Sequence, residues 1–226
     1  MYLQRDIGFF CYFCPCGSVC RTPDCHYKIK DTMQKKEIAI FSGSFNPIHA
    51  GHLMLASYMC EFTHLDEVWL LVSPHNPLKE ADELLNDQQR LEMVSSALEP
   101  FSNLKASDVE FHLPRPSYTI DTLDHLTALH PDMHFTLIIG ADNWNQLHLW
   151  KEYERLLLTY PLLIYPRRGE EVMIPEALRE SVLMVDAPMV EISSTFIRKS
   201  ISEGRDMRAF LPERVYDLIV KNGWYR

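Results

Sequence analysis

The sequence predicts an α/β protein with a doubly wound parallel sheet in three layers, and two observations lead to this prediction. Several short runs are apolar throughout, which indicates strands in a sheet that is covered on both faces. Segments of helix length separate these runs, as in βαβ units with right-handed crossovers. Ligands bind such sheets beyond the carboxyl ends of the strands. We therefore expect the functional site in the loops that follow Phe41, Val72, Ile139 and Tyr165.

The strands are predicted where apolar runs stop at glycine, proline or polar residues. Glu37–Phe41 stops at Ser42-Gly43, and Val68–Val72 stops before Pro74. A weaker strand is expected over 104–109. Further buried strands are expected over 135–139, 162–165 and 182–185.

The helices are predicted from apolar residues at helical spacing. The first covers 52–62, and the second begins at Asn86 or Asp87, either of which can cap it, and ends before Pro100. Two more cover 119–129 and 194–203. The last helix has Pro212 in its first turn and Gly223 just past its end.

Composition excludes several classes of protein. The 226 residues are 46% hydrophobic, which excludes a disordered chain, and no apolar run approaches the roughly 20 residues of a membrane helix. The net charge of −9 argues against a non-specific nucleic-acid binder, because nothing offsets phosphate repulsion. We therefore expect neither a nucleic-acid partner nor a membrane partner, and a cytoplasmic location.

The N-terminal segment differs from the rest of the chain. Residues 1–36 carry a net charge of +3 and the remainder −12. The segment could bind zinc through its thiolates, form disulfides, or be an unstructured extension or upstream sequence before a natural start at Met33. We expect an extension at 1–34 outside the fold and one domain at 35–226. Five of the six cysteines lie in this segment: Cys11, Cys14, Cys16, Cys20 and Cys25.

The loop after the first strand carries the strongest functional signal, reading S-G-S-F-N-P-I-H-A-G-H over residues 42–52. His49 and His52 are three apart at the start of a helix, so both imidazoles lie beside its free N–H groups. Such a place favours an anion and could hold a phosphate. A pair of metal ligands is the other functional interpretation. No carboxylate or third histidine lies within one turn on that face.

This loop resembles the HxGH signature of a nucleotidyltransferase superfamily, and a second signature of that superfamily, I-S-S-T-x-I-R, is present at Ile192–Arg198. Two further stretches, 116–123 and 140–150, are similar to bacterial nicotinate-nucleotide adenylyltransferases. The resemblance extends from about Glu37 to the C-terminus. It implies a Rossmann-like fold and transfer of an adenylyl group from ATP to nicotinate mononucleotide, with release of pyrophosphate.

The resemblance also implies roles on the ATP side. His49, His52 and Arg198 are implied as catalytic groups that donate to phosphate oxygens, and the histidines are expected to become charged near neutral pH. Mg²⁺ is expected on the ATP phosphates rather than in a dedicated protein site. The implied ATP-binding residues are Gly43, Ser44, Phe45, His49, His52, Gly140, Asp142, Ser193, Ser194, Thr195 and Arg198.

On the acceptor side, Trp150 resembles the aromatic residue that stacks on the pyridine ring, and Thr119 resembles a contact of the nicotinate carboxylate. The implied mononucleotide-binding residues are Lys79, Tyr118, Thr119, Trp150 and Arg167. Two positions depart from the family pattern. Asn46 replaces a common aspartate, and Leu78 occupies the usual histidine position, with His75 three residues earlier.

Two alternatives remain open. One is an adenylyltransferase for nicotinamide mononucleotide, because one sequence does not fix the choice between acid and amide. The other is a non-catalytic nucleotide sensor with a metal-binding arm at residues 11–26. The sequence does not define an oligomeric state.

Overall fold

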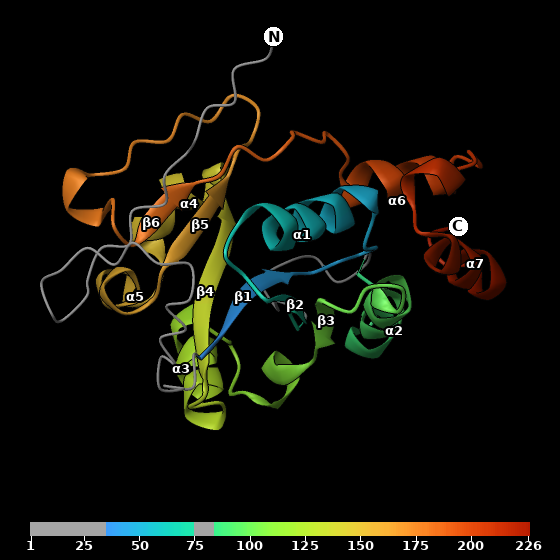
Figure 1. Ribbon diagram of the computed structural model, residues 1–226. Helices are drawn as coiled ribbons and strands as arrows, with labels where there is room; N and C mark the ends of the chain where they lie inside the picture. The colour runs from blue at the N-terminus through green and yellow to red at the C-terminus, as the bar shows by residue number, and fades with distance from the viewer. Residues whose placement is uncertain (1–34, 75–83) are drawn as a thin grey trace, which may run out of the picture. The chain divides into compact units, whose positions relative to one another are not determined.

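The computed structural model describes residues 35–74 and 84–226, in which six parallel strands form one sheet of order β3-β2-β1-β4-β5-β6 (Figure 1). The predicted doubly wound parallel α/β fold is confirmed. The expectations for residues 1–34 and for His75, Leu78 and Lys79 lie outside the described residues. The strands are β1 Lys36–Gly43, β2 Glu67–Val72, β3 Leu104–Ser107, β4 Met133–Gly140, β5 Leu162–Tyr165 and β6 Val182–Met184.

Two strand predictions need correction. The strand expected over 104–109 ends at Ser107, whose hydroxyl accepts a hydrogen bond from the Val109 N–H, and a 3₁₀ helix follows (η2, Val109–His112). The strand expected to be buried over 182–185 is β6, in which Val182 is buried while Leu183 and Met184 are exposed. β6 has this pattern because it lies at the edge of the sheet and pairs only with β5.

The helices cover both faces of the sheet. They are α1 Ala50–Phe62, α2 Asp87–Leu98, α3 Thr119–Leu129, α4 Ala141–Asn145, α5 Tyr153–Thr159, α6 Ser194–Ser202 and α7 Glu213–Asn222. Asn86 begins α2 by accepting a hydrogen bond from the Gln89 N–H, and Gly223 ends α7 with a φ of 66°. Pro212 is the residue before α7 rather than part of its first turn. α4 and α5 were not expected.

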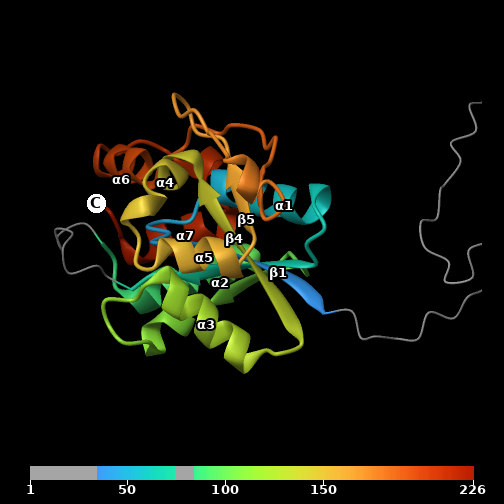
Figure 2. The same ribbon diagram turned by 90° about the vertical axis from the view of Figure 1, so that its left-hand side faces the viewer.

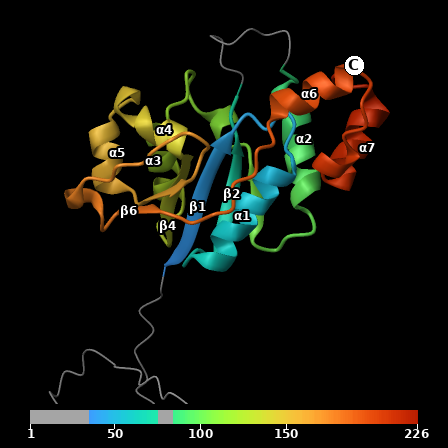
Figure 3. The same cartoon turned by 90° about the horizontal axis from the view of Figure 1, so that it is seen from above.

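Two apolar clusters lie on opposite faces of the sheet, as the three-layer prediction requires. Alternate residues of β1 belong to each: Ala39 and Phe41 to one, Ile38 and Ile40 to the other. α1, α2, α6 and α7 pack on the first cluster. α3 and α5 pack on the second, and Figures 2 and 3 show these two groups of helices on either side of the strands.

The strand order reverses between β1 and β4. From β1 the chain adds β2 and β3 on one side, then crosses to add β4, β5 and β6 on the other. Such a switch point leaves a crevice at the carboxyl ends of the two central strands, which here are Gly43 and Gly140. Within the described residues, no helix is long and apolar enough to cross a membrane.

Candidate active site

The loop after β1 delivers two stacked histidines to the start of α1. His49 is the residue that precedes the helix, and His52 is its third residue. The His49 backbone N–H donates to Nδ1 of His52 at 3.2 Å, and the ring centroids lie 3.7 Å apart at an interplanar angle of 20°. His49 is buried and His52 is half-buried. The pair therefore lies beside the free N–H groups of the helix, as predicted.

The environment of these imidazoles keeps them neutral in the free protein. Burial and the charge on Arg167 together lower the pKa of His49 from 6.5 to about 4. Burial, His49 and Arg167 together hold the pKa of His52 well below its usual value. Each neutral ring offers a single N–H donor at pH 7. A bound anion would raise both pKa values.

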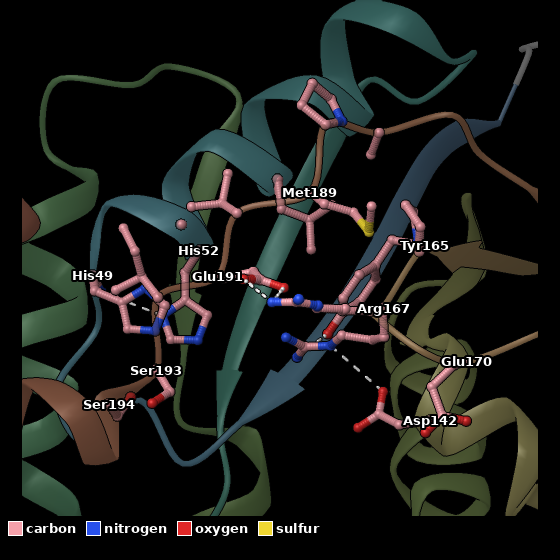
Figure 4. A pocket seen from close by; sticks show the side chains of 18 of the residues that line it. His49, His52, Asp142, Tyr165, Arg167, Glu170, Met189, Glu191, Ser193 and Ser194 are labelled. Atoms are coloured by element: carbon pink, nitrogen blue, oxygen red, sulfur yellow. Dashed lines mark hydrogen bonds and ion pairs between the residues drawn. The ribbon is translucent and has the colours of Figure 1, made fainter.

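A cavity of about 650 Å³ opens at the switch point, beside the two histidines. Its walls come from the loops after β1, β4 and β5, from the segment before α6, and from the start of α6. Figure 4 shows the imidazoles side by side, with the Arg167 side chain across from them. The cavity brings together six predicted site residues: His49, His52, Asp142, Arg167, Ser193 and Ser194.

Arg167 is held at the cavity wall by its neighbours. Its Nη2 donates to the Tyr165 hydroxyl at 2.9 Å, its guanidinium lies 5.0 Å from the centre of that ring, and its Nε lies 3.5 Å from Oδ1 of Asp142. The sequence assigned this arginine to the acceptor side. The structure places it in the cavity with the histidine pair.

Gly140 allows Asp142, Tyr165 and Arg167 to pack closely at the end of β4, because a side chain at position 140 would meet all three. A Cβ atom there would lie 3.1 Å from Cζ of Tyr165 and 3.2 Å from Nε of Arg167, and it would overlap the carboxylate of Asp142. Gly140 therefore admits the side chains of Asp142, Tyr165 and Arg167 at the end of β4, and its part in ATP binding stays a prediction.

Residues from distant parts of the chain hold the carbonyl groups of the β1 loop. Nη1 of the fully buried Arg90 donates to the Ser44 carbonyl at 2.6 Å. Nη1 of Arg198 donates to the Asn46 carbonyl at 3.0 Å, and the Ser194 hydroxyl donates to the Pro47 carbonyl at 2.9 Å. Arg198 and Ser194, both predicted for phosphate, thus also position the loop that carries the histidines.

The start of α6 differs in detail from the expectation. The hydroxyl of Ser193, implied as an ATP contact, accepts a hydrogen bond from the Phe196 N–H at 3.1 Å and so caps the helix.

The buried Phe45 ring lies edge-on to the His52 ring, with the ring centroids 5.0 Å apart. Phe45 does not itself line the cavity. Six residues predicted for ATP lie outside the cavity lining: Gly43, Ser44, Phe45, Gly140, Thr195 and Arg198.

Two predicted acceptor residues lie next to each other at the start of α3. Tyr118 precedes the helix, and Thr119 is its first residue. Lys151, which follows Trp150, places its Nζ 4.8 Å from the centre of the Tyr118 ring and 2.8 Å from Asp121 in the first turn of α3. None of these residues lines the cavity at the histidines.

Sequence reasoning missed several residues around the site, namely Arg90, Tyr165 and Tyr225. Arg90 had a signal, since it lies four residues before Val94 and hence on the buried face predicted for that helix. Tyr165 ends a buried strand two residues before Arg167. Nothing in the sequence relates Tyr225 to the first loop.

A doubly wound sheet with a histidine pair at the first helix and an arginine opposite defines a nucleotide-binding α/β protein of the nucleotidyltransferase class. Comparison with known proteins sharpens this assignment. The sequence pattern of the cytidylyltransferase-like family matches residues 40–200. The chain belongs to this family and, within it, to the nicotinate-nucleotide adenylyltransferases, as its relatives show.

Two curated relatives are each named probable nicotinate-nucleotide adenylyltransferase. That of Bacteroides fragilis is 50% identical over 189 residues, covering 84% of this chain and 94% of the relative. That of Flavobacterium johnsoniae is 46% identical over 194 residues, covering 84% and 99%. A solved structure, Plasmodium falciparum nicotinic acid mononucleotide adenylyltransferase complexed with NaAD, is similar in fold. It has a TM-score of 0.70 at 24% identity and covers 84% of this chain and 97% of that one.

Proposed function

We propose that this chain transfers the adenylyl group of ATP to nicotinate mononucleotide, giving nicotinate adenine dinucleotide and pyrophosphate in NAD biosynthesis. The observation that carries the proposal is the cavity at the switch point, where His49 and His52 face Arg167 beside the start of α1. The relatives named above carry the same activity in their names. The expected cytoplasmic location is part of the same proposal.

In this reaction an oxygen of the acceptor 5′-phosphate attacks the α-phosphorus of ATP in line. A new P–O bond forms as the bond to the bridging oxygen breaks, and pyrophosphate leaves with the electron pair. Phosphate is already a competent nucleophile, so the protein needs to supply position and charge stabilisation rather than a strong base.

His49 and His52 donate N–H groups to phosphate oxygens in this proposal, together with the free N–H groups of α1. Arg167 supplies a positive charge across the cavity, and burial together with that charge lowers the pKa values of both imidazoles. The start of α6, with Ser193 and Ser194, adds a second helix N-terminus on the same cavity. This combination suits a triphosphate.

The acceptor lies at the start of α3 in the same proposal. Thr119 and Tyr118 offer the first turn of a helix, which favours a carboxylate, and Trp150 offers a half-buried ring for the pyridine. Lys151 lies beside Tyr118 and forms an ion pair with Asp121. The helix N-terminus is the feature that favours nicotinate over the uncharged amide.

Mg²⁺ is proposed to arrive on the ATP phosphates, where it neutralises charge on the leaving pyrophosphate. Two carboxylates of the cavity are already ion-paired: Asp142 with Arg167, and Glu191 with Arg168. Among the described residues, no group of three or more His, Cys, Asp and Glu side chains could hold a metal ion. The cavity therefore suits a metal held mainly by phosphate oxygens.

The test compares kcat/KM for nicotinate mononucleotide with kcat/KM for nicotinamide mononucleotide. ATP is the second substrate in both assays, and the rate is measured as release of pyrophosphate. We expect the acid to be preferred at least tenfold. Preference for the amide would overturn the choice of substrate. Nucleotide binding without release of pyrophosphate from ATP in the presence of either mononucleotide would favour the sensor instead.

We also propose that residues 35–226 carry the whole activity. The family pattern begins at residue 40, and the Flavobacterium relative is covered over 99% of its length by 84% of this chain. Replacing Cys11, Cys14, Cys16, Cys20 and Cys25 together by serine should leave kcat/KM within twofold of the wild type. Loss of activity together with loss of stoichiometric zinc would show that the cysteine segment is needed.

A further inference from the structure

Glu110 is a buried acid that the proposed reaction does not use. It lies in η2, between β3 and α3, and only 6% of its surface is exposed. Burial raises the pKa of this carboxyl group above its usual value, and hydrogen bonds from hydroxyl groups oppose the rise. Burying an acid costs several kcal/mol unless its oxygens are satisfied, so its partners need an explanation.

Four hydroxyl groups surround this carboxyl group: those of Ser42, Ser73, Ser117 and Thr122. The Ser42 hydroxyl donates to Oε1 of Glu110 at 3.1 Å, and it lies 2.9 Å from the Ser73 hydroxyl. Since a carboxylate can accept about four hydrogen bonds, one side chain can bind all of these groups.

The hydroxyl groups come from two different parts of the proposed site. Ser42 is the residue before Gly43, at the start of the loop that carries the histidines. Ser73 follows β2 and donates its backbone N–H to the Gly43 carbonyl at 2.9 Å. Both therefore belong to the ATP side of the switch point.

The other two hydroxyl groups belong to α3. Ser117 comes directly before Tyr118, and Thr122 lies in the first turn, where its single hydroxyl proton can go to Glu110 or to the Tyr118 carbonyl, which lies 3.3 Å away. Glu110 thus connects the loop after β1 with the end of α3 that carries Tyr118 and Thr119.

We propose that Glu110 is a positioning residue that fixes the start of α3 relative to the β1 loop, so that the acceptor phosphate lies in line with the α-phosphorus. This inference rests on the proposed function for its catalytic consequence. Glu110 touches neither substrate. Its effect is geometric, and a displacement of about 1 Å at a reacting centre can cost about 10²-fold in rate.

The test uses Glu110→Gln in the full chain, which keeps the shape but replaces one acceptor oxygen by an NH₂ donor. We expect KM for nicotinate mononucleotide to rise about tenfold and kcat to fall, with KM for ATP within twofold of the wild type. Ser117→Ala, at a half-buried position that tolerates truncation, should change the same constants in the same direction by a smaller factor.

Glu67→Gln is the matched control. Glu67 is also 6% exposed and is hydrogen-bonded to Lys36 and Trp69. It is the first residue of β2, so it lies at the amino ends of the strands, away from the proposed site. This variant should lower the melting temperature without separating the two KM values. Equal changes in both KM values for Glu110→Gln, or the same profile as Glu67→Gln, would overturn the positioning role.

Hydrogen exchange of the free protein separates this inference from the proposed function, because it requires no turnover. Glu110→Gln should speed exchange of the amides of residues 118–122 at least tenfold more than Glu67→Gln does. If the wild type transfers nothing to either mononucleotide, the proposed function fails while this readout still decides the inference. Unchanged exchange in the first turn of α3 would overturn it.

Discussion

The hydroxyl of Tyr225 donates a hydrogen bond of 2.7 Å to Oδ1 of Asn46, across 179 residues of chain. Oδ1 of Asn46 also accepts from the Leu85 N–H at 3.3 Å, and Arg198 binds the carbonyl of the same residue. The C-terminal segment and α6 therefore hold the turn that precedes His49. Asn46 keeps these acceptor contacts without the charge of the aspartate common in the family.

Tyr225→Phe removes one of these hydrogen bonds and keeps the ring. We expect the free energy of unfolding to fall by about 0.5–1.5 kcal/mol, because one hydrogen bond is lost while Oδ1 of Asn46 keeps the Leu85 N–H as a partner. KM for ATP should rise a few-fold, since the loop that positions His49 loosens. Urea unfolding and initial rates measure both. Tyr153→Phe, whose hydroxyl meets an exposed carboxylate at Glu154, is the control and should change neither quantity.

The lowered pKa of His49 makes stability depend on pH. The folded state holds this pKa at about 4, whereas the unfolded chain has 6.5. Between these values the unfolded state binds more protons, so stability falls as pH drops from about 7 to 4. Each pKa unit corresponds to about 1.4 kcal/mol, so His49 contributes up to about 3 kcal/mol to this loss. His49→Gln should lose correspondingly less stability between pH 7 and pH 4.5 in urea unfolding. Identical losses in both proteins would refute the prediction.

Much of the fold was predictable because its signals are local. Continuous apolar runs and helical spacing indicated the six strands and the longer helices. α4 and α5 were not predicted because they have five and seven residues, too few to show a helical spacing of apolar residues. α5 also begins after Glu152, which has a left-handed conformation. The exposure of Leu183 and Met184 depends on β6 being an edge strand, which only the assembled sheet defines.

The site was predictable where its residues lie close together in one sequence motif, as His49 and His52 do. Contacts between distant parts of the chain were not predictable from the sequence. Arg90 lies 46 positions from Ser44, and Tyr225 is further still from Asn46. Arg167, implied as an acceptor residue, lines the cavity with His49 and His52, and this placement depends on how β5 lies beside β4, where Asp142 follows.

Gly140→Ala tests the close packing at the end of β4. The added methyl group would crowd Tyr165 and Arg167, so we expect a stability loss of about 1–3 kcal/mol and at least a tenfold rise in KM for ATP. Asn143→Ala, at an exposed position three residues on, should leave both quantities near the wild-type values. Wild-type KM for ATP in Gly140→Ala would show that the Asp142–Arg167 arrangement does not matter for ATP.

Trp150→Leu tests the proposed acceptor side. Loss of ring stacking should raise KM for nicotinate mononucleotide about tenfold, in line with about 0.5–1.5 kcal/mol for an aromatic contact beyond its burial. KM for ATP should stay within twofold. Trp144→Leu is the matched control, because Trp144 is also half-buried and packs on the same apolar cluster. If Trp150→Leu and Trp144→Leu raise KM for nicotinate mononucleotide to the same extent, Trp150 contributes to packing of the apolar cluster and not to substrate binding.

The most direct measurement is the rate at which His52→Asn releases pyrophosphate from ATP with nicotinate mononucleotide as acceptor. Met54→Ala, at an exposed position of the same helix, is the control. Asparagine keeps a hydrogen-bonding group near the His49 backbone N–H, so the helix start should stay folded. Removal of a donor to the transition state predicts a fall in kcat of about 10²–10³, with Met54→Ala unchanged. Turnover by His52→Asn close to that of the wild type would contradict the account.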